Sequence, residues 1–538
     1  MNIISIASFI TATSAVALFT YILVGRMKKS KSATEEYFTG GRALTWPMVA
    51  GSLLLTNLST EQLVGLNGDV FGDKALVGVA WEALAAFAMI ATALVFLPTY
   101  LASGFTTTPA FLEKRFDKTT RSMVSGLFLF GYVTVLLPVV LYTGSLALIT
   151  MFGLNMPLYI VVAIIGVLGS SYAIFGGLKS VAVSDTLNGI GLLIGGLAIP
   201  FLALVALGGG SFFEGLLTLG RDNPQYLAVL AQENIDGKTV TVPWPTLFTG
   251  MMFIQVFYWS TNQVIVQRAM AARSLAEGQK GVLFASGMKL LGPIMLCLPG
   301  IIALHMPDLN IGKQDQVYGA VVRHVLPDWS LGLFAAVLVG SILSSFNSAL
   351  NSASTLFSLQ FYRGYFNPSA SGEETVKIGK YFGVLLAVAS ILIAPLLAQM
   401  DSIFQYLQKV NGLYSVPIIG IFLLGITTKH VPAIAAKIGM IVGISFYSFF
   451  TFVNIKNVIP FFANTDGDLH WLHGYFISFL ASIGVMLIIG HLAPKTEEEI
   501  AVSEEKTPAP VDMTPWPLAK KVSVGIFSAT VAIYLLLT

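Results

Sequence analysis

The chain has 538 residues, of which 55% are hydrophobic and only 11% are charged, and its formal net charge is +2. Soluble domains carry about 25% charged residues, so this composition indicates a protein that crosses the membrane many times. The small net charge gives no reason to expect a nucleic-acid partner. The single cysteine, Cys297, excludes an internal disulfide, and no grouping of Cys and His residues predicts a zinc site.

The apolar segments predict about 14 transmembrane spans. Basic residues follow the first segment, which favours a transmembrane helix with its N-terminus outside over a cleaved signal peptide. Most Lys and Arg residues then fall in cytoplasmic loops, and both termini lie outside. The predicted spans are 4–25, 46–72, 76–103, 121–153, 157–176, 181–208, 245–267, 279–305, 330–362, 379–400, 402–428, 431–453, 471–492 and 521–537.

The second predicted span, 46–72, carries the polar run TNLSTEQ (56–62) in its middle. Unpaired polar groups in hydrocarbon cost several kcal/mol each. Ser59 and Gln62 have the spacing of a capping box, which belongs at the start of a helix. We therefore predict that the helix breaks at about 56–58 and that a second half-helix starts near Ser59. The alternative is a polar packing patch that neighbouring helices satisfy.

A break at this depth would leave carbonyl groups at the end of the first half-helix, and such groups suit Na⁺. A later span contains Ser341, Ser344, Ser345 and Ser348, whose spacing places their hydroxyls on one helix face. Hydroxyls of this kind often bond only their own backbone. If they face the break, however, they complete a cage of neutral oxygens for a hard monovalent cation.

Charged residues inside the predicted spans are expensive to bury and therefore point to function. They are Glu61, Glu82, Asp185, Lys289 and Lys409. Glu61 has a structural alternative, because a negative charge is favourable in the first turn of a helix. For Glu82 and Lys289 the structural alternative is a mutual ion pair. Asp185 would either anchor its helix at the membrane interface or act as an anionic ligand on the exit route.

Several long motifs resemble the solute:sodium symporter family, in particular its sodium/glucose cotransporter branch. The resemblance covers essentially the whole chain and rests on EEYFTGGRALTWP (35–47), ASGFTTTPAFLEKRF (102–116), SYAIFGGLKSVAVSDTLNGIG (171–191), YWSTNQVIVQRAMAARSLAEGQKG (258–281) and SSFNSALNSASTLFS (344–358).

The resemblance implies an all-α polytopic membrane protein with a LeuT-like core of two five-helix inverted repeats, 46–208 and 245–428. The matching break in the second repeat is expected within 253–263. The flanking parts would be an extra N-terminal helix and cytoplasmic loop (1–45), an external loop (209–244) and three additional helices with a cytoplasmic linker (429–538).

The resemblance also implies that Na⁺ is the coupling ion and that no organic cofactor is needed. Backbone carbonyls and two hydroxyls hold the main ion in the family, and the matching residues are Leu55, Leu58, Ser341, Ser344 and Ser345. Some members hold a second Na⁺, for which the matching residues are Asp185, Ser344 and Ser348. Asn347 departs from that second pattern, since those members have a small or hydroxyl-bearing residue there.

In the sugar-transporting branch, polar side chains bind the sugar hydroxyls, and the matching residues are Asn57, Gln62, Glu82, Gln255, Lys289 and Gln408. Tyr258 matches an inner gate beneath the sugar, and the outer lid matches Leu66, Trp81 and Phe404. Amide and carboxylate groups beside aromatic faces suit a neutral polyol. Leu136 replaces a polar position, and the absence of an arginine near it argues against an acidic sugar.

The prediction is a sodium-coupled secondary active symporter that imports a neutral, hexose-like sugar by alternating access across the inner (plasma) membrane. Its partners would be the sugar, sodium ions and the lipid bilayer, with no nucleic acid. The alternatives keep the fold but change the solute to an inositol, an amino acid or sialic acid, or else assign a membrane sensor or channel. An enzyme is not expected, because no nucleophile–base pair or metal cluster is evident in the sequence.

Overall fold

The computed structural model describes residues 3–26, 40–105, 107–400, 402–453, 455–456, 458–504, 509 and 511–537, with no side chains described at 171–181. Regular secondary structure is helical throughout these residues, and β-type pairing is limited to isolated bridges. The basic cluster predicted at 26–31 lies outside the described residues except for Arg26, as does the start of the 35–47 motif.

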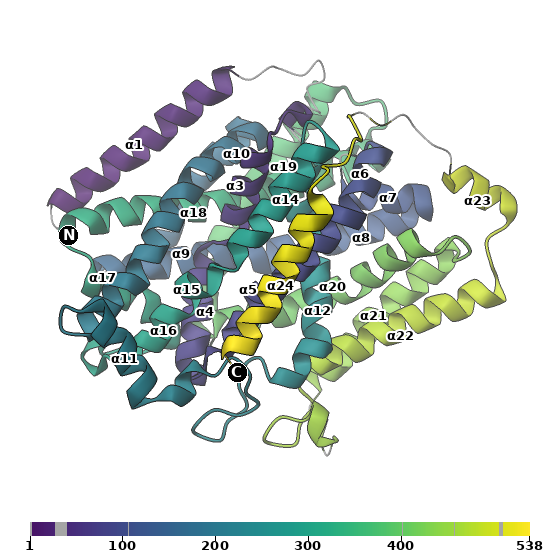
Figure 1. The fold of residues 1–538 in the computed structure, drawn as a ribbon. Helices are drawn as coiled ribbons and strands as arrows, with labels where there is room; N and C mark the ends of the chain where they lie inside the picture. The colour runs from purple at the N-terminus through teal and green to yellow at the C-terminus, as the bar shows by residue number, and fades with distance from the viewer. Residues whose placement is uncertain are drawn as a thin grey trace.

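The helices form one bundle, in which α1 begins at the left of Figure 1 and α24 ends near the bottom centre, with α17 and α11 at the left and lower left. In chain order they are α1 (Ile3–Arg26), α3 (Trp46–Asn57), α4 (Thr60–Asp73), α5 (Val79–Ala91), α6 (Leu97–Ser103), α7 (Thr108–Arg115), α8 (Lys118–Gly131), α9 (Leu137–Phe152), α10 (Leu158–Leu207), α11 (Phe212–Asp222), α12 (Gly250–Ser260), α13 (Gln263–Met270), α14 (Leu275–Lys289), α15 (Gly292–Leu296), α16 (Leu298–Ala303), α17 (Val317–Val325), α18 (Asp328–Thr355), α19 (Gly372–Ile393), α20 (Ile403–Thr427), α21 (Ala433–Phe452), α22 (Trp471–Leu492), α23 (Glu497–Glu504) and α24 (Ala519–Leu537).

The predicted number of 14 spans is not confirmed. Within the described residues, ten helical segments are long and apolar enough to cross a bilayer, and the pair Leu275–Lys289 and Gly292–Ala303, bent by 50°, makes an eleventh. The segments predicted at 46–72 and 245–267 consist of half-helices, each too short to span alone. The segments predicted at 157–176 and 181–208 belong to one 50-residue helix, α10, and the connection expected between them lies among residues without described side chains.

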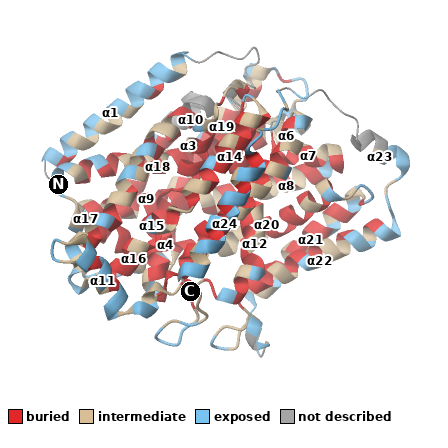
Figure 2. Ribbon diagram, in the orientation of Figure 1, coloured by how far each residue is buried: buried red, intermediate tan, exposed pale blue. Residues whose placement is uncertain are grey.

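The helices that carry the predicted site are buried, whereas α1 lies on the surface. Figure 2 shows α3, α4, α9 and α18 as mainly buried and α1 as mainly exposed. Only Ser5 and Thr20 of α1 are buried, although the helix is strongly apolar, so its exposed face suits contact with lipid. The polar residues of α3, α4 and α18 must therefore find partners inside the protein or in a bound ligand.

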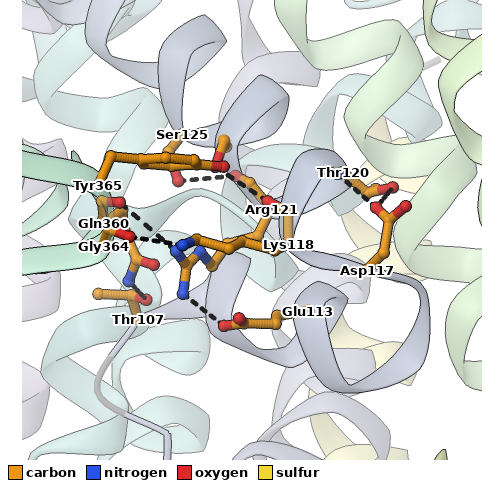
Figure 3. A network of polar contacts seen from close by, with 11 residues as sticks. Thr107, Glu113, Asp117, Lys118, Thr120, Arg121, Ser125, Gln360, Gly364 and Tyr365 are labelled. Atoms are coloured by element: carbon orange, nitrogen blue, oxygen red, sulfur yellow. Dashed lines mark hydrogen bonds and ion pairs between the residues drawn. The ribbon is translucent and has the colours of Figure 1, made fainter. Parts of the chain in front are cut away.

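A polar network fastens α7 and α8 to η9 (Leu356–Phe366), which continues α18 (Figure 3). The Arg121 guanidinium pairs with Glu113 and also donates to the Gln360 carbonyl at 3.4 Å. The Gln360 amide donates to Thr107 Oγ1 at 2.8 Å. Helix α7 begins at Thr108, and Thr107 is its N-cap residue.

Candidate functional site

The helix predicted to break within 46–72 is broken, at the position the sequence indicates. Helix α3 ends at Asn57 and α4 begins at Thr60, and Leu58 and Ser59 between them have non-helical backbone angles. The Ser59 amide donates to the Asn57 carbonyl at 2.8 Å. The Leu55 carbonyl therefore loses the amide four residues ahead that a continuous helix would give it.

The capping-box expectation is wrong in its side-chain detail. Ser59 is the N-cap residue of α4, but its hydroxyl donates to the Asn57 carbonyl at 3.4 Å and does not accept from the Gln62 amide. That amide donates instead to the Ser59 carbonyl, at 3.1 Å. The Asn57 carbonyl at the end of α3, which also accepts from the Ser59 amide, lies close enough to compete for the hydroxyl. Gln62 Oε1 and Glu61 Oε2 remain buried without a hydrogen bond.

The second break also lies where the sequence places it, within 253–263. Helix α12 ends at Ser260 and α13 begins at Gln263. The Asn262 side chain accepts a hydrogen bond from the Val264 amide at 3.1 Å and another from the Tyr132 hydroxyl at 2.8 Å. The side-chain cap thus replaces the backbone partner that the first turn of α13 lacks.

The serine face of α18 meets the first break. Ser341 Oγ donates to the Leu58 carbonyl at 3.1 Å, and Ser345 Oγ donates to the Thr56 carbonyl at 3.4 Å. Ser344 Oγ is buried and has no hydrogen-bond partner. The structure therefore brings two of the predicted residues, Ser341 and Leu58, into direct contact, and it places Ser345 against the neighbouring Thr56 carbonyl. Rotating the serine hydroxyls would turn oxygen lone pairs toward a cation there.

The residues predicted for a second Na⁺ lie beside this region, between α3, α10 and α18. Asp185 Oδ2 accepts from Ser52 Oγ at 2.7 Å, while Oδ1 is buried without a hydrogen bond. Ser348 Oγ lies 3.5 Å from Thr56 Oγ1 on α3. A buried carboxylate with one free oxygen would provide a negative ligand that the main Na⁺ region lacks.

Sequence reasoning missed the burial of Arg268. The predicted span 245–267 ends one residue before Arg268, so the sequence places this charge outside the membrane. The structure buries Arg268 completely on α13, where its guanidinium donates to the Val264 carbonyl and two of its nitrogens have no hydrogen-bond partner. The polar sequence around the second break was the only feature of the sequence that could have indicated this burial.

The ion pair considered for Glu82 and Lys289 is confirmed, and Asn57 joins it. The Lys289 ammonium pairs with Glu82 and donates to Asn57 Oδ1, and both charged side chains are buried. The ammonium also lies 5.6 Å from the centroid of the Trp259 ring. This cluster links α3, α5 and α14, and its directional polar groups are of the kind that bind hydroxyls.

Three other residues predicted to contact the solute have different surroundings from this cluster. The Gln255 amide donates to the Trp81 carbonyl at 2.7 Å, which ties α12 to the predicted lid. Tyr258 is half-buried and packs edge-on against Trp259, with ring centroids 5.3 Å apart. Gln408 lies half-buried on α20, and within the described part of the chain no hydrogen bond joins it to Glu82, Lys289 or Asn57.

The predicted outer-lid residues pack together and are closed. The Trp81 and Phe404 rings meet edge to face, with centroids 5.2 Å apart and planes at 89°. A Cβ atom on Gly65 of α4 would lie 2.6 Å from the Phe404 Cβ, so α20 approaches α4 where α4 has no side chain. Leu66, Trp81 and Phe404 are all buried.

Paired half-helices around buried polar groups, beneath a closed aromatic lid, define a membrane transporter with a LeuT-type core. A model of the Sodium:solute symporter family matches residues 37–443. The chain belongs to the sodium:solute symporter family.

The similar proteins include bacterial and animal symporters. The chain is 40% identical to the uncharacterized symporter YidK of Escherichia coli, over 99% of this chain and 91% of that protein. It is 32% identical to a sodium/glucose cotransporter of Vibrio parahaemolyticus, over 83% of this chain and 85% of that protein. A mouse sodium/myo-inositol cotransporter is 29% identical, over 78% of this chain and 64% of that protein.

A solved structure supports the fold. The substrate-bound, outward-open state of a Na⁺-coupled sialic acid symporter superposes with a TM-score of 0.76, over 92% of this chain and 99% of that chain, at 20% identity. At this identity the likeness concerns the fold alone. The expected class, an all-α membrane protein with a LeuT-like core, is thereby confirmed.

Proposed function

We propose that this symporter uses the Na⁺ gradient to import a neutral, hexose-like sugar across the plasma membrane, with both chain termini outside. The contact between the serine face of α18 and the broken helix carries the proposal. Hydroxyls of Ser341 and Ser345 already bond carbonyls of the break, so a cation placed there would contact both elements. The family supports Na⁺ as the coupling ion.

The cluster of Glu82, Lys289 and Asn57 supports a hydroxyl-rich solute without net charge. Its carboxylate and ammonium are already paired, so a charged solute would find no unbalanced partner between them. A sugar hydroxyl both donates and accepts, so it can insert between an ammonium and an amide oxygen. Two relatives are named sodium/glucose and sodium/myo-inositol cotransporters, and these supply the two leading solute classes.

In the proposed cycle, external Na⁺ binds between α3, α4 and α18 and favours the state in which the lid is open. The solute then binds, and Phe404 and Trp81 close over it. Inward opening separates α13 from α18 and releases both ligands. The membrane potential contributes about 2.3 kcal/mol per charge per 100 mV. Coupling follows because the closed state is stabilised only when Na⁺ and the solute are bound together.

The test is uptake into proteoliposomes with an imposed Na⁺ gradient and a panel of labelled hexoses, inositols and amino acids. Ser345→Ala should reduce the apparent Na⁺ affinity at least tenfold, because one hydroxyl ligand and its bond to the break are lost. Ser390→Ala is the matched control, since its hydroxyl is equally buried but bonds its own helix on α19. Unchanged Na⁺ dependence in Ser345→Ala would reject the assigned ion site. Na⁺-driven uptake of inositols but of no hexose would show that the solute is an inositol and not a hexose.

A further inference from the structure

One buried carboxylate near the lid takes no part in the site described above. Asp69 lies on α4, is 1% exposed, and accepts hydrogen bonds from two other parts of the chain. Ser402 Oγ donates at 2.8 Å and Gln405 Nε2 at 2.7 Å, both from the start of α20. Gln314 Nε2 donates at 3.3 Å from η8 (Gln314–Gln316). The carboxylate thus joins three elements.

The two α20 donors flank Phe404, a residue of the predicted lid. Ser402 is the N-cap residue of α20, and its hydroxyl also accepts from the Gln405 amide. Phe404 lies between these two residues, in the same helical turn. Gly65, which Phe404 packs against, precedes Asp69 by four residues and therefore lies on the same face of α4. Asp69 consequently holds the turn that presents Phe404 to Trp81.

The charge of Asp69 is balanced by hydrogen bonds and not by a cation. No Lys, Arg or His within the described residues forms an ion pair with it. Its buried neighbour is another acid, Asp315, whose Oδ1 has no hydrogen-bond partner. A buried carboxylate in such surroundings depends on its donors. If α20 moved away, water would have to replace Ser402 and Gln405, which ties solvation of Asp69 to lid opening.

We propose that Asp69 is the positioning residue of the outer lid. Its carboxylate fastens the first turn of α20 to α4 when the lid is closed and exchanges these donors for water when the lid opens. The inference rests on the proposed function, which assigns this end of the bundle to the outside and Phe404 to the lid.

The chain offers a matched control one turn further along α4. Asp73 is also a buried acid, at 6% exposure, and it too accepts several hydrogen bonds. Its donors are the Thr241 amide at 3.1 Å and the Thr241 hydroxyl at 2.6 Å, so it ties α4 to the 239–242 loop and has no bond to α20. Losing Asp73 removes a comparable buried carboxylate but leaves the lid attachment intact.

The test measures lid opening with a thiol reporter. Cys297, the only native cysteine, is replaced by serine, and Leu66→Cys places the reporter in the lid itself, at a position that is fully buried while the lid is closed. A membrane-impermeant maleimide is added from outside, without Na⁺. Asp69→Ala should raise the labelling rate roughly tenfold, because two charge-assisted hydrogen bonds that hold the lid closed are lost. Asp73→Ala should label at the parent rate. Equal rates in the two variants would overturn the proposal.

A second variant covers the case in which Asp69→Ala fails to fold. Replacing both Ser402 and Gln405 by alanine removes the same bonds while keeping the carboxylate, and should raise labelling to a similar extent. Combining it with Asp69→Ala should add little, since the bond is already lost. If the double variant labelled at the parent rate, or if its effect on the labelling rate and that of Asp69→Ala simply added, Asp69 would not hold α20 through Ser402 and Gln405.

The same experiment separates the role of Asp69 in holding the lid from the proposed transport function. If added Na⁺ fails to raise labelling of the parent protein, Na⁺-driven outward opening is wrong. The comparison of Asp69→Ala with Asp73→Ala is made without Na⁺ and still decides the role of Asp69. If instead Na⁺ raises parental labelling and Asp69→Ala labels fast without it, both inferences hold.

Discussion

Lys289→Met should destabilise the protein more than the simultaneous replacement of Lys289 and Glu82 by Met and Gln. The two charged side chains are 0% and 1% exposed, so water does not screen the charge that a single replacement leaves behind. Removing one partner of a buried ion pair typically costs about 3–5 kcal/mol, whereas replacing both with neutral groups of similar size is often close to neutral. The Asn57 oxygen also loses its ammonium donor in either variant.

The measurement is the thermal unfolding midpoint of the purified protein in detergent, for the two single variants and the double variant. Lys313→Met is the control, because this lysine is exposed and its ammonium donates to the Ala398 carbonyl at the surface. It should change stability by less than about 0.5 kcal/mol. A Lys289→Met variant no less stable than the double variant would refute the reasoning, since the cost would then not come from the unpaired Glu82 carboxylate.

Three further predictions concern contacts outside the central cluster. Arg115→Met should lower stability by about 2–4 kcal/mol, measured as a thermal midpoint, because its guanidinium donates to three carbonyls, including those of Gly425 and Thr428 at the end of α20. Gln267→Ala should lower the apparent Na⁺ affinity of uptake several-fold, because its bonds between α13 and α18 must break for inward opening in the proposed cycle, and their loss would favour the inward-open state. Asp315 lies outside the spans, and burial, followed by the charge of Asp69, raises its pKa from 3.8 to about 7. Its protonated form is therefore favoured in the folded state, and that stabilisation is complete below about pH 4 and lost as the pH rises through about 7. The thermal midpoint should fall over this range, and Asp315→Asn should flatten the fall.

The two helix breaks could be predicted from the sequence because each leaves a local trace. Polar residues in the middle of an apolar run cannot face lipid, so either a break or a partner is required. The break at Leu58–Ser59 follows from this reasoning, and the break at Thr261–Asn262 follows from the resemblance to the symporter family. The direction of a single hydroxyl does not follow, because Ser59 chooses between a carbonyl behind it and an amide ahead of it.

Residues whose role depends on distant partners could not be predicted. Asp69 lies in the sequence NGD, which by itself predicts no special role. Its role comes from hydrogen bonds with Ser402 and Gln405, more than 330 residues away. Arg268 follows a predicted span by one residue, and only the packing of α13 against the core decides that it is buried. The number of spans also depends on the bends and breaks between helix segments, which hydropathy does not record.

If the cluster of Glu82, Lys289 and Asn57 binds the solute as proposed, the solute must carry well-placed hydroxyls. With the lid closed, the ammonium already has a carboxylate and an amide oxygen as partners, so an entering solute has to replace bonds that exist. A polyol offers both donors and acceptors and can restore each bond that it breaks. An analogue that lacks one hydroxyl would leave a buried polar group unpaired, at about 1–3 kcal/mol. Discrimination should therefore appear as selective loss of deoxy-sugar uptake, strongest for the hydroxyl that meets Lys289. Equal uptake of the parent sugar and all of its deoxy analogues would mean that this cluster does not bind the solute.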